Sequence, residues 1–306
     1  MTILKGYSNT NSESGVHSLS DSQVHKEKVE IGVFKCGNIA TSPLFELLLD
    51  ELAERQDIKT RTVTTGSKMG VDDIEEALPK ILEFDPDLFV LVSPNPSIPG
   101  PSKVTDELSR TSVPVVVISD APGKRVMAKL EKQGLGYIIV MGDPLIGARR
   151  EFLDPLEMAI FNSNIIKVLA ITGVYRIIHQ EIDKLIQAVK KKAEPALPKI
   201  VIDIDVIRDF SDFRNPYAKA KAMAAYELTK KIAEINVKAC FIEKERDKYI
   251  PLVACAHEIA QAAARLAEEA REIEKYGDTL VRRPHSKSGK PKIKTKLMLP
   301  PSDSES

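Results

Sequence analysis

The stretch VEIGVFKCGNIATSPLFELLLDELAER, residues 29–55, decides the fold of this chain. It begins with a short apolar run, Val29 to Phe34, of the kind that forms a strand buried on both faces. A glycine turn follows, and then a helix in which a Thr-Ser pair can cap the start and Pro43 suits the first turn. Such a strand–turn–helix unit presents free backbone N–H groups at the start of the helix, where they can bind an anion or a polar ring edge.

The same alternation continues downstream. Strands are predicted at 29–34, 58–63, 88–92, 114–119 and 136–141, and helices are predicted between them, near 42–55, 71–83, 101–110 and 123–133. Short apolar strands separated by helical segments are typical of a doubly wound parallel sheet with right-handed crossovers. In such sheets ligands bind outside the carboxyl ends of the strands, where the strand order changes.

Five stiff, sharply turned segments follow the predicted strands. They read KCGN, TTGSK, SPNP, SDAPG and MGDP. The segment SPNPSIPGPSK, residues 93–103, has four prolines within eight residues, and because proline fixes φ this loop is expected to be a rigid wall. Five such loops at one edge of a sheet favour a binding site over the alternative that they are merely short, stiff connections.

The chain divides into four predicted parts. They are a disordered N-terminal extension at 1–28, an α/β ligand-binding domain at 29–153, a helix bundle at 154–278 with an inserted strand near 199–204, and a tail at 279–306 with the strands of a small antiparallel sheet. The fold class is therefore α/β, a doubly wound and mostly parallel sheet with an appended helix bundle and a small antiparallel sheet. The strand near 199–204 is expected to join the small sheet. An alanine-rich helix from Lys248 to Lys275 is expected in the bundle or between subunits.

Composition excludes several classes of function. The 44 basic and 44 acidic residues balance, so no overall field attracts nucleic acid or an anionic membrane. Three cysteines without C-x-x-C spacing indicate a reducing compartment rather than a disulfide framework or a zinc site. The chain has no apolar run of membrane-spanning length and no signal-peptide core, so we expect a soluble cytoplasmic protein.

No motif of nucleophilic catalysis or nucleotide hydrolysis is present. The sequence lacks the G-x-S-x-G elbow, the Walker loop and the G-x-G-x-x-G fingerprint. His257-Glu258 begins like a zinc-protease motif, but Gln261 stands where the second histidine would be, so no metal is expected there. Rigid loops instead suit a site that orients two flat ligands, as hydride transfer requires.

Five segments carry a resemblance to a known family. KCGNIATSP, SPNPSIPGP, SDAPG, QGLGYIIVMGDPLIGARREFLDP and NPYAKAKAMAAYE resemble the coenzyme F420-dependent methylenetetrahydromethanopterin dehydrogenases. The resemblance runs from about Val29 to about Ser288, and the first 28 or so residues depart from it. It implies reversible hydride transfer from the methylene carrier to the deazaflavin, giving the methenyl carrier and reduced coenzyme F420, in methanogenesis or its reversal. It also implies coenzyme F420 as a dissociable cosubstrate, no metal, no prosthetic group, and a homohexamer built as a trimer of dimers.

The two ligands are expected at the carboxyl ends of the strands. The predicted deazaflavin contacts are Lys35, Cys36, Gly37, Asn38, Thr41, Ser93, Pro94, Asn95, Asp120, Pro122 and Gly123. Cations for the anionic tail of the coenzyme are expected from Lys35, Lys68 and Lys124. The tetrahydromethanopterin carrier is expected to contact Met141, Gly142, Asp143, Pro144, Arg149 and Arg150.

Hydride loss from this carrier needs no general base. Two nitrogens flank the methylene carbon, and their lone pairs stabilise the amidinium cation that remains. Carboxylates at Asp120, Asp143 and Glu151 are therefore expected to act electrostatically. For Asp143 the alternative is that it only caps the turn that follows it. If its charge is what matters, Asp143→Asn lowers kcat/KM and leaves the melting temperature about the same.

Two other classes of function remain open from the residues alone. One is a non-enzymatic ligand-binding or regulatory protein on the same sheet, which would also need stiff loops. The other is a nicotinamide-dependent dehydrogenase of the same fold, against which the missing fingerprint glycines count.

Overall fold

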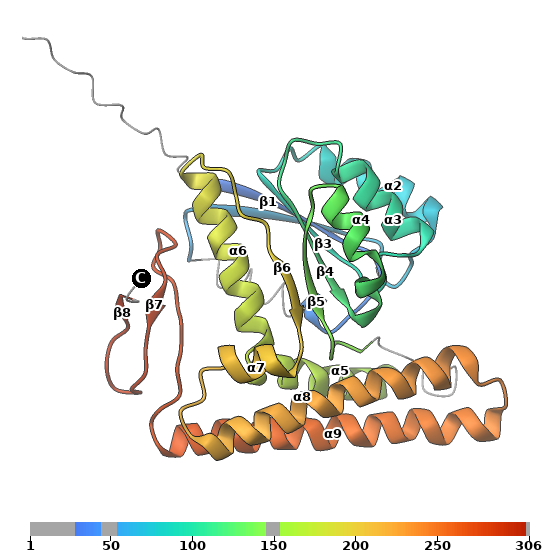
Figure 1. Ribbon diagram of the computed structural model, residues 1–306, viewed down its shortest axis with the longest axis vertical. Helices are drawn as coiled ribbons and strands as arrows, with labels where there is room; N and C mark the ends of the chain where they lie inside the picture. The colour runs from blue at the N-terminus through green and yellow to red at the C-terminus, as the bar shows by residue number, and fades with distance from the viewer. Residues whose placement is uncertain (1–27, 44–53, 145–153, 304–306) are drawn as a thin grey trace, which may run out of the picture.

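The computed structural model describes residues 28–43, 54–144 and 154–303 (Figure 1). Six parallel strands form one sheet in the order β2-β1-β3-β4-β5-β6, and two short strands form a separate antiparallel sheet. The large sheet consists of β1 (Val29–Lys35), β2 (Ile58–Thr64), β3 (Leu88–Val92), β4 (Val115–Asp120), β5 (Gly136–Val140) and β6 (Lys199–Ile202). The predicted doubly wound α/β fold is confirmed.

Helices cover both faces of the large sheet. On one face pack α2 (Val71–Leu82), α3 (Pro99–Leu108) and α4 (Met127–Lys132), the last preceded by the 3-10 helix η1 (Ala121–Val126). On the other face packs α6 (Val174–Lys190). Strands β3, β4 and β5 are buried along their whole length, which explains why they read as continuous apolar runs.

A bundle of three long helices lies across the carboxyl ends of the strands (Figure 1). It consists of α5 (Pro155–Thr172), α8 (Pro216–Val237) and α9 (Arg246–Tyr276), and a π-helical turn, η3 (Lys238–Ile242), follows α8. The side of α9 that packs on its neighbours consists of small residues, which let the helix axes approach closely; they are Ala256, Ala260, Ala263, Ala264 and Ala267. The predicted alanine-rich helix therefore lies in the bundle.

A sharp bend joins the bundle to the sheet. Asp154 caps α5 by accepting the N–H groups of Leu156 and Glu157. The helix ends at Gly173, whose φ of 100° few other residues adopt, and α6 starts directly after it at an angle of 65° to α5. Among the described helices none is by itself long and apolar enough to cross a membrane, and only the bent pair of α5 and α6, taken together, has the length and composition to do so.

The structure corrects the prediction for residues 199–204. This strand pairs in parallel with β5, from Tyr137 to Val140, so the expectation that it joins the small sheet is wrong. A short helix that the sequence did not predict, α7 (Ile204–Phe210), follows it. The small sheet is made by β7 (Lys292–Ile293) and β8 (Ser302–Asp303).

A C-terminal hairpin, residues 282–294, turns at the Ser-Lys-Ser-Gly segment, residues 286–289. Its two arms pair at Arg282 with Lys294 and at His285 with Pro291. Nearly all of the predicted extension at 1–28 and most of the predicted helix at 42–55 lie outside the described residues. The predicted domain boundary at 153–154 falls at the edge of another such segment and stays a prediction.

Ala260 tests the packing of α9. Its side chain is fully buried, so in Ala260→Lys a long charged side chain meets packed atoms. We expect the free energy of unfolding to fall by about 3 kcal/mol or more and the melting temperature to fall by roughly 6–12 °C. The matched control is Ala262→Lys on the exposed side of the same helix, where a change within about 0.5 kcal/mol is expected. Equal melting temperatures for the two variants, with an unchanged mass by light scattering, would contradict this packing.

Candidate functional site

The stiff loops meet at one edge of the sheet, as predicted. Because all the strands are parallel, the segments after β1, β3, β4 and β5 lie at the same edge. Neighbouring loops are joined by backbone hydrogen bonds, from Cys36 N to Val92 O and from Ser93 N to Ile118 O, each at 3.0 Å. The strand order changes between β1 and β3, and that is the position where doubly wound sheets bind ligands.

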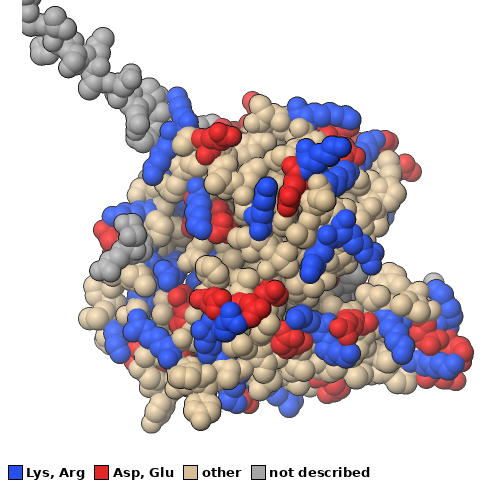
Figure 2. Space-filling view, in the orientation of Figure 1, with Lys and Arg blue, Asp and Glu red and all other residues tan. Residues whose placement is uncertain are grey.

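A cleft of about 460 Å³ opens between this edge and α8. We call it the carboxyl-edge cleft; its walls are formed by Asp120, Ala121, Pro122, Arg125 and Met141 on one side and by Lys230, Ala233, Glu234, Asn236 and Val237 on the other. In Figure 2 the surface is indented between the part of the molecule that contains the sheet and the projecting ends of α8 and α9. Its size, and walls of mainly apolar surface with a few charged groups, suit a flat organic ligand.

Two buried carboxylates stand behind the cleft. Asp143 is fully buried; its Oδ1 accepts the N–H of Ala40 at 2.6 Å and its Oδ2 accepts the N–H of Thr41 at 3.0 Å. Asp120 is 3% exposed and accepts the N–H groups of Ala121 and Asp143. The two acids thus fix the turn after β1, the turn after β4 and the end of β5 to one another.

Burial dominates the ionisation of both acids. It raises the pKa of Asp143 to about 6, although the contacts from Thr41 and Ala40 lower it. Burial and the neighbouring charge of Asp143 raise the pKa of Asp120 well above its usual range. A cation that develops in the carboxyl-edge cleft would favour ionisation of Asp120, since this acid lines the wall.

The described contacts of Asp143 give it a role that neither alternative named. Its carboxylate accepts the N–H groups of two residues in the segment after β1, 102 and 103 residues away in sequence. Since both oxygens are engaged by backbone N–H groups, asparagine would lose an acceptor, and we therefore expect the melting temperature of Asp143→Asn to fall. A direct role of this side chain toward the carrier stays a prediction.

The other predicted carrier contacts divide into three groups. Met141 is half-buried and lines the carboxyl-edge cleft. Gly142 and Pro144 are buried, and a Cβ on Gly142 would collide with the hydroxyl of Thr229 on α8. The remaining predicted residues, Arg149, Arg150 and Glu151, lie outside the described residues.

The predicted deazaflavin contacts lie at the edge, but only some reach the cleft. Asp120 and Pro122 line it. The turns after β1 and β3 lie beside the cleft. In these turns Asn38 and Asn95 are partly exposed. The predicted contacts whose side chains are buried are Lys35, Cys36, Thr41, Ser93 and Pro94. Gly123 is also buried, against Ser119 and Ile139.

Cys36 and Gly37 contribute backbone rather than reactive side chains. The Cys36 thiol packs in the core beneath α2 and α3, and burial raises its pKa to about 12, so it stays neutral and is no nucleophile. Gly37 has a φ of 82°, and a Cβ there would lie 2.6 Å from the sulfur of Met69 and 2.8 Å from the ring of Pro94. Only glycine allows this close approach.

The predicted cations for an anionic tail are unevenly placed. Lys35 is 8% exposed, whereas Lys124 is exposed and Lys68 is exposed and pairs with Asp73 at 3.4 Å. Sequence reasoning missed two cations in the cleft wall, Arg125 and Lys230. The second comes from α8, whose sequence predicts a helix but gives no sign that this helix covers the carboxyl edge.

Comparisons with known proteins identify a family and several similar chains. A family model described as methylene-5,6,7,8-tetrahydromethanopterin dehydrogenase matches residues 29–302. Similar curated proteins are named F420-dependent methylenetetrahydromethanopterin dehydrogenase. The protein of Methanothermobacter thermautotrophicus is 55% identical over 273 residues, 89% of this chain and 99% of its own, and that of Archaeoglobus fulgidus is 51% identical over 273 residues with the same coverage.

A solved structure is also similar. It is an F420-dependent methylene-tetrahydromethanopterin dehydrogenase in complex with methylene-tetrahydromethanopterin and coenzyme F420. It superposes with a TM-score of 0.87 at 45% sequence identity, covering 90% of this chain and 99% of its own.

The pH dependence of stability tests the environment of Asp143. Its folded-state pKa of about 6 lies above the ordinary value of 3.8, so the folded chain binds this proton more tightly than the unfolded chain does. The contribution to the free energy of unfolding is therefore present below about pH 4 and falls as the pH rises through about 6. Asp143→Asn loses one acceptor for a buried N–H, which costs about 1–3 kcal/mol.

We expect the loss in free energy of unfolding caused by Asp143→Asn to be largest near pH 4 and to shrink by roughly 1–3 kcal/mol by pH 7. Denaturant unfolding of both proteins between these pH values measures it. Asp203→Asn, at the capping residue of α7, controls for losing an acid elsewhere. A deficit that grows with pH would mean that the N–H groups, and not burial, control this acid.

Proposed function

We propose the function of this chain from one premise: it belongs to the methylene-5,6,7,8-tetrahydromethanopterin dehydrogenase family. It is an oxidoreductase that transfers a hydride reversibly between methylene-tetrahydromethanopterin and coenzyme F420. The observation that carries this is the likeness, over 90% of the chain, to a structure holding that carrier and that coenzyme. Coenzyme F420 acts as a cosubstrate.

The described residues fit two flat ligands at the carboxyl edge. The carboxyl-edge cleft has the volume of a small-molecule site, and its wall combines apolar surface with the acid Asp120 and the bases Arg125 and Lys230. Beside it, the Ser42 hydroxyl at the start of the helix after β1 is buried and has no hydrogen-bond partner within the described part of the chain. When bound, coenzyme F420 takes up the hydride that the methylene carbon releases.

The protein contributes position and charge. The turns after β1 and β3 are fixed by their glycine and prolines, which keeps the coenzyme site formed before binding. Asp120 lines the cleft; the amidinium cation of the product favours its ionised form, and the carboxylate in turn stabilises the cation. Asp143 acts behind it by holding the turn after β1, and it is a positioning residue.

We also propose the setting of the enzyme. It is a cytoplasmic homo-oligomer, a hexamer built as a trimer of dimers, as the family resemblance implies. Support comes from large apolar side chains that this chain leaves exposed near the start of α5 and around η3, namely Leu156, Ile160, Val237, Phe241 and Ile242. Exposed apolar groups of this size often mark contacts between subunits.

An absorbance assay tests the activity and separates it from its rivals. We expect the band of oxidised coenzyme F420 to disappear when the chain is mixed with both the coenzyme and methylene-tetrahydromethanopterin, and to persist when either the chain or the carrier is left out. Reduction of NAD(P) in place of the deazaflavin would identify a nicotinamide-dependent dehydrogenase. Tight binding of both ligands without turnover would identify a binding protein, and either result would overturn the proposal.

Asp120→Asn tests the charge in the cleft. Asparagine keeps an oxygen for the Ala121 N–H but offers one acceptor fewer than the carboxylate, which also accepts the Asp143 N–H, so the melting temperature is measured beside the activity. We expect kcat/KM to fall roughly ten- to a thousandfold, as when one charge-stabilising group is removed. Asp203→Asn is the matched control, because this acid also caps a helix after a strand but does not line the cleft. A fully active Asp120→Asn enzyme would exclude the charge role.

A further inference from the structure

A second cavity, of about 690 Å³, lies between α6 and the C-terminal hairpin. None of its lining residues lines the carboxyl-edge cleft. Its wall contains two histidines and an acid from two different segments: His179 and Asp183 on one face of α6, and His285 on the hairpin. These three residues have no part in the proposed hydride transfer.

The donor atoms of the three side chains converge. Asp183 Oδ2 lies 2.7 Å from His285 Nε2 and 3.5 Å from His179 Nε2. One nitrogen or oxygen from each residue lies within 4.8 Å of the other two. A tetrahedral ion with bonds of about 2.0–2.1 Å holds its ligands roughly 3.3 Å apart, and the two distances from Asp183 Oδ2 lie on either side of that value.

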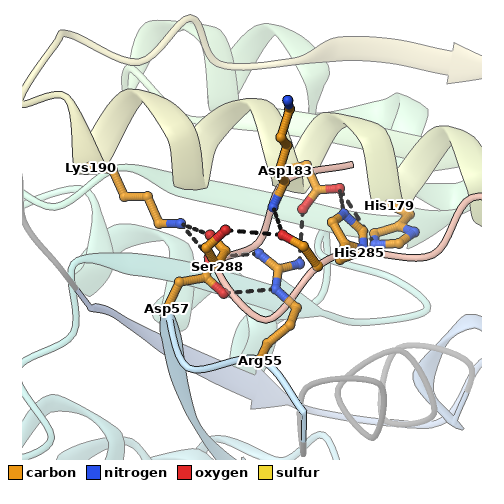
Figure 3. A network of polar contacts seen from close by, with 9 residues as sticks. Arg55, Asp57, His179, Asp183, Lys190, His285 and Ser288 are labelled. Atoms are coloured by element: carbon orange, nitrogen blue, oxygen red, sulfur yellow. Dashed lines mark hydrogen bonds and ion pairs between the residues drawn. The ribbon is translucent and has the colours of Figure 1, made fainter. Parts of the chain in front are cut away.

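Arg55 fixes the acid from behind. Its guanidinium lies 3.2 Å from Asp183 Oδ1, which leaves Oδ2 directed at both histidines (Figure 3). Arg55 also makes two hydrogen bonds of 3.0 Å to Asp57, and Lys190 pairs with the same Asp57 carboxylate. Such outer hydrogen bonds orient the ligands of metal sites.

We propose that His179, Asp183 and His285 bind a divalent transition-metal ion of the Zn²⁺ class. Two imidazole nitrogens and one carboxylate oxygen are ligands that Zn²⁺, Co²⁺ and Ni²⁺ accept, and water from the cavity completes the coordination. On binding, the ion takes the place of the hydrogen bond between His285 and Asp183: a charged His285 ring releases its Nε2 proton to water, and a neutral ring carries its proton on Nδ1 instead. The site is structural, because it ties the C-terminal hairpin to α6 at a distance from the carboxyl edge.

Nearby cations set the expected affinity. Arg176 and Arg283 also line the cavity, and both pair with the single carboxylate of Asp212. Their excess positive charge weakens the binding of a metal ion, so we expect a dissociation constant on the order of micromolar rather than the much tighter values of four-ligand zinc sites.

The test uses the full-length chain without a histidine tag, with His17 and His25 replaced by glutamine, after removal of metal with EDTA. Zn²⁺ is titrated by calorimetry, and bound metal is counted after dialysis. We expect one ion per chain and a melting temperature raised by about 5 °C at a hundredfold excess of Zn²⁺ over the dissociation constant. Bound Co²⁺ should give the visible absorption of an ion with fewer than six ligands.

Two ligand variants and one control identify the site. His179→Gln and His285→Gln should each weaken Zn²⁺ binding at least tenfold; Asp183 is left intact because it also holds Arg55. The control His257→Gln replaces a partly buried histidine of α9 and should bind as the parent does. Far-UV circular dichroism confirms that each variant folds. No stoichiometric binding by the parent at about 100 μM Zn²⁺, or undiminished binding by both ligand variants, overturns the proposal.

Discussion

The carboxyl edge of this sheet must satisfy its backbone N–H groups even where the bundle covers it. Buried amides that lack a partner cost free energy comparable to a lost hydrogen bond. Here the acids at the ends of β4 and β5 accept those amides, and the turn after β1 depends on a carboxylate a hundred residues further along the chain. The architecture of the edge therefore depends on two side chains whose burial makes their charge costly.

Much of the α/β fold could be predicted because its signal is local. Strands such as β3 and β4 are apolar throughout, and the glycine and proline residues between elements mark the turns. β6 was assigned to the wrong sheet because a four-residue strand at a sheet edge has a mixed burial pattern that does not specify its neighbour. Pairing partners of short strands are decided by tertiary packing, which a sequence pattern does not contain.

The candidate site could likewise be predicted only where its signal is local in the sequence. The ends of the predicted strands identify the edge of the sheet and its loops, so Asp120 and Met141 in the cleft wall could be predicted. The opposite wall was missed because the periodicity of α8 predicts a helix without saying what the helix covers. The position of Asp143 at the end of β5 could be predicted, but the direction of its carboxylate is set by amides in the segment after β1.

The packing of α8 against the end of β5 has a consequence for the shape of the enzyme. Gly142 lets Thr229 and Tyr226 lie directly on the backbone of the sheet, and the Tyr226 hydroxyl donates to Ile202 O at 2.6 Å. The helix thus lies directly on the sheet, and its next two turns, from Lys230 to Val237, form the far wall of the cleft. A single methyl group at position 142 would push α8 away from the sheet and tilt the wall that this helix forms. The width of the ligand site is therefore set by a residue that does not line it.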